Sequence, residues 1–216
     1  MSRCLPAVAI TMLVLVCVGS PNARAGSAQP SVQFVASAAA LASNDSYDWA
    51  SLGAATNPIH VTSVLGNALT ISLASSNAAV VHQGFGYSGS FPVGTYALYN
   101  QFNGDYTIAF GTPVMGFGTD LDDAFQGAFD ATIEAFAGTT SLGVFPASTL
   151  TAHTLLYLGV SDDVAEITSV KLHESSNYFA IGPLSLITTV PEPSDDQSFA
   201  AAAIGMAGLV SLRRRS

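Results

Sequence analysis

The sequence predicts an all-β fold, an antiparallel β-sandwich of roughly eight to eleven strands. Apolar and polar residues alternate in short runs such as FDATIEAF (129–136), which is the period of a half-buried strand. Most of these runs are bounded by Gly, Asn, Asp, Ser or Pro, the residues that favour turns. No long stretch between the two chain ends keeps a helical period with caps, so parallel α/β folds are disfavoured.

The N-terminal segment, residues 1–25, has the features of a secretory signal peptide. Arg3 precedes an apolar run over 5–18, which is too short to span a bilayer comfortably and predicts a signal helix. Small residues surround the bond between Ala25 and Gly26, where we expect signal peptidase to cut. The chain is therefore expected to be exported.

Two alternatives to cleavage remain open, an uncleaved membrane anchor and lipoprotein processing at Cys17. The small residues before Gly26 favour cleavage, and Val16 is a poor residue to precede a lipoprotein cysteine. Both cysteines, Cys4 and Cys17, lie in the segment that would be removed, so the mature domain has neither disulfides nor a cysteine metal site.

Charge is divided sharply along the chain. Between residues 26 and 189 a single basic residue, Lys171, stands against twelve acidic residues, which gives a formal charge of −11. Nucleic-acid binding draws its affinity from Lys and Arg on phosphates, so this class of partner is excluded. Adsorption of the domain to anionic lipid is disfavoured for the same reason.

The middle of the chain carries the expected strands. In chain order, the candidate strand sequences are SVQFVA, PIHVTSVL, ALTISLA, AAVVHQ, the stretch around Tyr106–Phe110, PVMGFG, FDATIEAF, SLGVF, TLLYLGV, EITSVKL and NYFAIGPLSLI. The Ala-rich SAAALAS near residue 40 is compatible with a short helix at most. Trp49, the only tryptophan, is expected to cap the core.

Seven aromatic residues crowd the stretch 84–106, GFGYSGSFPVGTYALYNQFNGDY, among Gly, Ser and Asn. Tyr87 and Tyr99 are examples of rings that such a loop would present for stacking on sugars, with amides and hydroxyls beside them. The alternative is a packed loop that covers a sheet edge. This second interpretation is favoured, since seven aromatic residues are rarely all exposed.

Asp120, Asp122 and Asp123, in GTDLDD (118–123), are the candidate calcium ligands. The spacing of an EF-hand is absent, because no glycine follows in register and no glutamate closes a twelve-residue loop. A solvated acidic loop is the favoured interpretation, and no cofactor is expected.

No catalytic residues are predicted. Asp130 and Glu134 stand four apart on an expected strand, hence about 13 Å apart, which is beyond the separation that glycosidases use. The four histidines are scattered without metal-ligand spacing, and Gly-x-Ser-x-Gly is absent. These observations favour a non-enzymatic protein.

The C-terminal segment, residues 190–216, reads VPEPSDDQSFAAAAIGMAGLVSLRRRS. Its apolar run over 199–212 would form a short hydrophobic helix of about 21 Å, against roughly 30 Å of hydrocarbon, so it is a marginal transmembrane helix. Arg213, Arg214 and Arg215 follow it and are expected to stay cytoplasmic, which leaves the preceding domain on the outer side.

The motif Pro191-Glu192-Pro193, the apolar run and the arginine cluster, in this order, resemble the PEP-CTERM sorting tail of Gram-negative bacteria. The resemblance implies that an exosortase recognises the motif after export through the inner membrane and cuts near it. The protein would then be released or held at the cell surface. A permanent weak anchor behind a proline-rich linker is the alternative.

The middle, over residues 85–188, resembles the domain that often precedes such tails. The phrases that carry this resemblance are DYTIAFGTPVMGFGTDL, DATIEAFAGTTSLGVF and TLLYLGVSDDVAEITSVKL. It implies a jelly-roll or lectin-like sandwich and no particular activity. The last strand departs from the pattern, because Gly182-Pro183 replaces the acidic and amide residues that serve a structural cation in some sandwiches.

These observations divide the chain into a signal peptide (1–25), a β-sandwich (26–189) and a sorting tail (190–216). The predicted function is that of an exported surface or extracellular-matrix protein that binds exopolysaccharide and is not an enzyme. A secreted polysaccharide-active enzyme on the same scaffold is the alternative.

Overall fold

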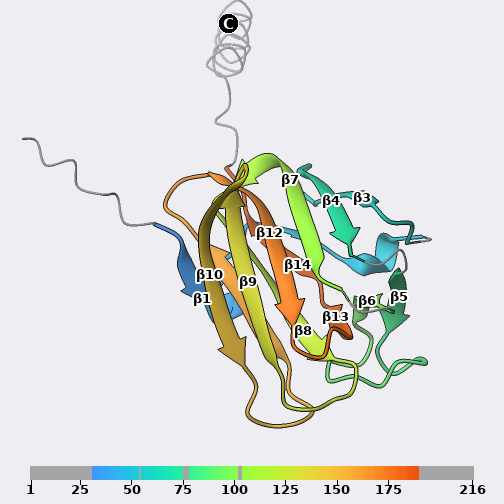
Figure 1. The fold of residues 1–216 in the computed structure, drawn as a ribbon. Helices are drawn as coiled ribbons and strands as arrows, with labels where there is room; N and C mark the ends of the chain where they lie inside the picture. The colour runs from blue at the N-terminus through green and yellow to red at the C-terminus, as the bar shows by residue number, and fades with distance from the viewer. Residues whose placement is uncertain (1–30, 54, 75–77, 102–103, 190–216) are drawn as a thin grey trace, which may run out of the picture.

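The computed structural model describes residues 31–53, 55–74, 78–101 and 104–189, and these form two antiparallel sheets packed face to face (Figure 1). The predicted all-β sandwich is confirmed. The expected signal peptide and sorting tail, with Ala25, Gly26, the Pro191–Pro193 motif and the arginine cluster, lie outside the described residues. Within the described part of the chain, none of the helices has the length and apolar character needed to cross a membrane.

The eight-stranded sheet has the order β1-β11-β8-β13-β6-β5, with β14 and β2 joined to it through β8. Its strands are β1 (Gln33–Val35), β2 (Asp45–Tyr47), β5 (Ala78–His82), β6 (Tyr96–Asn100), β8 (Gly116–Asp123), β11 (Leu156–Ser161), β13 (Phe179–Ile181) and β14 (Leu184–Ile187). Along one side, β8 pairs with β11, and along the other it pairs with β14 and then with β13. The break at Gly182-Pro183 between β13 and β14 separates what the sequence pattern suggested was one strand.

The six-stranded sheet has the order β10-β9-β12-β7-β4-β3. Its strands are β3 (Ile59–Thr62), β4 (Ala68–Leu73), β7 (Tyr106–Val114), β9 (Asp130–Ala137), β10 (Thr140–Ser148) and β12 (Ile167–Glu174). In β9 the buried residues Ala131, Ile133 and Ala135 alternate with more exposed neighbours, as the period of FDATIEAF predicts.

The core fills the space between the sheets. Ile108 and Ile133 of the six-stranded sheet and Phe117 and Leu121 of the other are fully buried. Trp49, in the short 3₁₀ helix Trp49–Ser51, is also fully buried, and its indole Nε1 donates to the carbonyl of Gly182 at 2.7 Å. The expectation that Trp49 caps the core is confirmed.

The structure has fourteen described strands where the pattern predicted roughly eight to eleven, because β2 and β6 were not predicted and NYFAIGPLSLI forms two strands, β13 and β14. With three residues, β2 is too short to show an alternation. The expected short helix is α1 (Ala38–Leu41), which begins after Ser37, whose side chain accepts from the N–H of Ala40.

Candidate functional site

The aromatic stretch forms both a strand and an ordered loop. Tyr96 and Tyr99 lie on β6, and residues 83–95 connect β6 to β5 at one edge of the eight-stranded sheet. The amide side chain of Gln83 reaches across this loop, with Nε2 donating to the Gly89 carbonyl at 2.7 Å and Oε1 accepting from the Gly89 N–H at 3.0 Å. The loop therefore holds a defined shape through its own hydrogen bonds.

A hollow of about 220 Å³ lies beside this loop, and we call it the tyrosine hollow. It is lined by Gly86, Tyr87, Ser88, Gly89, Tyr99, Ala124 and Gln126. The rings of Tyr87 and Tyr99 are tilted at 45° with centroids 6.1 Å apart, and both side chains are partly exposed. The hollow is thus bordered by two tyrosines, a glutamine, a serine and a glycine-rich main chain.

Asp122 of β8 fixes one side of the tyrosine hollow. Its carboxylate Oδ2 accepts from the Tyr87 hydroxyl at 3.0 Å and from the Ser90 N–H at 2.9 Å, and only 1% of the residue is exposed. Burial, together with the charge of Asp122 and the hydrogen bond to it, raises the pKa of Tyr87 well above its usual range. Tyr87 therefore stays protonated and donates to Asp122 under all physiological conditions.

Gly89 fits this arrangement because it has no side chain. A Cβ at this position would overlap Asp122 Oδ2 and the ring of Tyr87. The absence of a side chain allows the loop to approach β8 closely enough for Ser90 to donate to Asp122.

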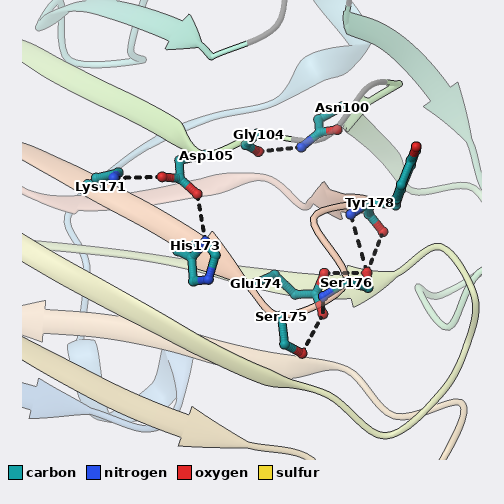
Figure 2. Close-up of polar contacts among 9 residues, drawn as sticks. All are labelled: Asn100, Gly104, Asp105, Lys171, His173, Glu174, Ser175, Ser176 and Tyr178. Carbon is teal, nitrogen blue, oxygen red and sulfur yellow. Dashed lines mark hydrogen bonds and ion pairs between the residues drawn. The ribbon is translucent and has the colours of Figure 1, made fainter.

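The other side of the hollow, residues 124–126, is tied to the turn after β12. The Ser176 hydroxyl lies 2.8 Å from Asp123 Oδ1 and also bonds Glu174, while the Ala124 N–H donates to the Tyr178 carbonyl at 2.9 Å. Figure 2 shows Ser176 between the carboxylate of Glu174 and the backbone of Tyr178. Asp123 and Glu174 are both buried, so this end of the sandwich is held by internal polar contacts.

The structure corrects the expected solvated acidic loop. Asp120, Asp122 and Asp123 belong to β8, which lies between β11 and β13, and the last two are buried. Because strand side chains alternate, Asp120 and Asp122 share one face of the sheet and Asp123 lies on the other. The three carboxylates therefore do not converge, and burial raises the pKa of Asp120. No cluster of three or more His, Cys, Asp or Glu side chains suited to a metal ion occurs among the described residues.

Asp130 and Glu134 lie on the same face of β9, and each is bonded by a nearby serine, Ser148 and Ser141 respectively. The histidines come from separate elements. His60 lies on β3, His82 ends β5, His173 lies on β12, and His153 is in an exposed segment with a φ of 57°.

One polar cluster was missed by sequence reasoning. Asp105 Oδ2 forms an ion pair with Lys171 Nζ at 2.6 Å, and Asp105 Oδ1 lies 2.7 Å from His173 Nδ1 (Figure 2). Partial burial raises the pKa of Asp105, but the hydrogen bonds and charges of Lys171 and His173 outweigh it, so the pKa is lowered overall. Only the alternation of Lys171 and His173 along β12 could have indicated that they share a face.

No known family model and no curated protein matches the sequence. Among solved structures, the chain is similar to a family 6 carbohydrate-binding module at 15% identity and a TM-score of 0.34, over 55% of this chain and 87% of that one. It is also similar to a family 61 carbohydrate-binding module in complex with β-1,4-galactotriose at 10% identity and a TM-score of 0.30, over 55% and 83% of the two chains.

A third similar structure is the catalytic domain of a GH87 α-1,3-glucanase in complex with tetrasaccharides, at 12% identity and a TM-score of 0.32. The similarity covers 58% of this chain and 29% of that protein. Two of these three structures are carbohydrate-binding modules.

Proposed function

We propose that this protein binds a neutral polysaccharide through the tyrosine hollow and does not act on it as an enzyme. The observation that carries the proposal is the pair of partly exposed rings, Tyr87 and Tyr99, beside a hollow of about 220 Å³. One ring is held by the buried carboxylate of Asp122, so its position does not have to be ordered when the ligand binds. Flat aromatic faces stack on the C–H faces of sugar rings, and a few polar groups then set the orientation.

The polar groups of the hollow suit hydroxyl-rich ligands. The Gln126 side chain offers both donors and an acceptor, and Ser88 adds a hydroxyl that can do either. Among the described residues that line the hollow, none has a charged side chain, and Asp122 contacts it only through the Tyr87 hydroxyl and the loop.

The charge of the domain favours an uncharged polymer. Between residues 26 and 189, Lys171 is the only Lys or Arg, and it is already paired with Asp105. An acidic polysaccharide would be repelled by the twelve carboxylates of this region and would have no free cation to bind.

We also propose export from a Gram-negative cell, with cleavage by signal peptidase before Gly26 and by an exosortase at Pro191-Glu192-Pro193. The sequence patterns of the two ends support this proposal, and the last described strand, β14, ends at Ile187, ahead of the motif. The domain would then act at the cell surface or in the extracellular matrix, where exopolysaccharide is the ligand. Intact mass of the protein from medium and membranes tests the processing: a chain that still contains residues 199–216 in both fractions contradicts it.

Binding is tested by affinity gel electrophoresis and a glycan array with residues 26–189 and three variants. Tyr99→Ala should weaken retardation by neutral glucans or galactans at least tenfold, because it removes one wall of the hollow. Tyr87→Phe keeps the ring but loses the bond to Asp122, and a smaller loss is expected. Phe34→Ala is the matched control, since Phe34 lies on β1, at the opposite edge of the eight-stranded sheet from β5.

Equal retardation of wild-type protein and Tyr99→Ala would contradict the assignment of the site. A silent array together with no retardation by any polymer would contradict carbohydrate binding itself. Thermal melting of each variant shows whether a loss of binding is a loss of folding.

A further inference from the structure

A second aromatic feature of the same hairpin is a stack of three rings. His82, at the end of β5, pairs in register with Tyr96 of β6, and their rings are 4.1 Å apart and nearly parallel, at 6°. Phe85 stacks on His82 with centroids 4.3 Å apart and 14° between the planes. The order of the stack is therefore Tyr96, His82, Phe85.

Phe85 is the outermost ring and is 69% exposed. Because His82 covers one face of the ring, the exposed area includes the opposite face. Val93, which is 80% exposed, lies in the same loop and within 3.1 Å of the place where a Cβ on Gly84 would be. Two large apolar side chains of one loop are therefore exposed to water, and exposed apolar surface that is gathered in one place marks interaction sites.

The turn that carries Phe85 is built to hold it there. Gly84 and Gly86 on either side have φ values of 83° and 97°, which L-residues with side chains adopt only at a cost. No atom lies within 4 Å of the place where a Cβ on Gly86 would be. A glycine is therefore favoured at this position by the backbone conformation and not by a lack of room for a side chain. The Phe85 N–H donates to the His82 carbonyl at 3.0 Å, which closes the turn and places the ring on the imidazole.

The stack and the tyrosine hollow lie on opposite faces of the β5–β6 hairpin. His82 and Tyr96 alternate with Val81 and Ala97, so they share the face of Val80 and Leu98, which packs toward the core. Tyr99 lies on the other face, where it packs with Ala97 and Tyr87. A single sugar ring therefore cannot touch both Phe85 and Tyr99.

We propose that the exposed face of Phe85 is a second, independent sugar-binding platform, so that each domain holds two segments of neutral polysaccharide. The ligand class rests on the proposed function, whereas the platform rests on the stack and its exposure. A pyranose ring laid on Phe85 would extend the stack to a fourth layer without moving the loop. Two sites on opposite faces allow one domain to cross-link two chains of a matrix polymer.

The test is the stoichiometry of binding by residues 26–189, measured by calorimetric titration with soluble neutral hexasaccharides of glucose and galactose. Wild-type protein should bind two oligosaccharides, and Phe85→Ala and Tyr99→Ala should each bind one. The double variant should bind none, and Phe34→Ala should bind two. Phe85→Trp should keep the second site that Phe85→Ala loses, because tryptophan also presents an aromatic face.

A second readout follows the imidazole directly. The side-chain ¹H–¹⁵N signals of His82 should shift on titration in Tyr99→Ala and stay unchanged in Phe85→Ala. Wild-type protein should also make a long neutral polysaccharide turbid or viscous, and either single variant should abolish this effect while still binding the polymer.

Each outcome separates the two proposals. One bound oligosaccharide that is lost in Tyr99→Ala and kept in Phe85→Ala overturns the platform and leaves the proposed function in place. A single bound oligosaccharide that is lost only in Phe85→Ala overturns the assignment of the tyrosine hollow as a binding site and supports the platform. No binding of any hexasaccharide or polymer overturns both.

Discussion

Two aspartates of this sandwich, Asp122 and Asp105, show how burial changes what a carboxylate does. Asp122 is nearly fully buried and orders a loop through Tyr87 and Ser90. Asp105 keeps 23% of its side chain exposed and pairs with Lys171 on the other sheet. Water can replace a lost partner at the second site and not at the first, so the two regions should respond to mutation with very different magnitudes.

The largest effect is expected for Asp122→Ala. Removing the buried carboxylate leaves the partly buried Tyr87 hydroxyl and Ser90 N–H without their acceptor, which should cost about 3 kcal/mol in the free energy of unfolding. Urea unfolding followed by the fluorescence of Trp49, the only tryptophan, measures the loss. Asp122→Asn keeps one acceptor oxygen and should lose less, and a loss below about 0.5 kcal/mol for the alanine variant would show that the contacts are dispensable.

The next effect is expected for Gly89→Ala. A methyl group here meets Asp122 and Tyr87, so overpacking should cost about 2 kcal/mol and displace the Tyr87 ring from the tyrosine hollow. Gly66→Ala is the matched control: its φ of 94° makes alanine costly by about 1 kcal/mol, but no atom lies within 4 Å of the added Cβ.

The two glycine variants differ in binding as well as in stability. Gly89→Ala should weaken retardation by neutral polysaccharide to the level of Tyr99→Ala, whereas Gly66→Ala should keep it at the wild-type level. If both variants lose equal stability and both still bind, then the close approach of the loop to Asp122 does not shape the site.

The same contrast explains what could be predicted from the sequence. The alternation in β9 and β4 indicates the sandwich correctly, because burial of one strand face produces a period of two. The prediction of a solvated loop at GTDLDD is wrong. A run of acidic residues favours a solvated loop, but in the fold Asp122 is buried by a loop that comes more than thirty residues earlier in the chain.

The candidate site was predicted in part. The aromatic stretch that contains Tyr87 and Tyr99 is visible in the sequence. The hydrogen bond from Tyr87 to Asp122 depends on tertiary packing, as does the ion pair between Asp105 and Lys171. Strand β6 was not predicted, because its sequence YALYN lies in a stretch rich in Gly, Ser and Asn that favours a loop, although tyrosine itself is common in strands. Long-range polar contacts leave no periodic signal.

The smallest effect is expected for Asp105→Asn, at about 0.5 kcal/mol near neutral pH, because the pair with Lys171 is partly exposed. Its pH dependence has a defined sign. The pKa of Asp105 is lowered from its ordinary value of 3.8, so its contribution is present above that value and is lost as the pH falls through the lowered pKa. The pKa of Lys171 is raised from 10.5 by its bond to Asp105, so its contribution is present below 10.5 and is lost as the pH rises through the raised pKa.

The difference in melting temperature between wild-type protein and Asp105→Asn should therefore be present at neutral pH and disappear in strong acid. Asp163→Asn, in the exposed turn after β11, is the control and should show little difference at any pH. High salt should reduce the Asp105→Asn effect, since exposed ion pairs are screened, whereas the Asp122→Ala effect should persist. The contrast between the two aspartates would fail if Asp105→Asn lost as much stability as Asp122→Ala and the loss did not depend on salt. That result would mean that the outer face of the six-stranded sheet is as shielded from water as the loop over β8.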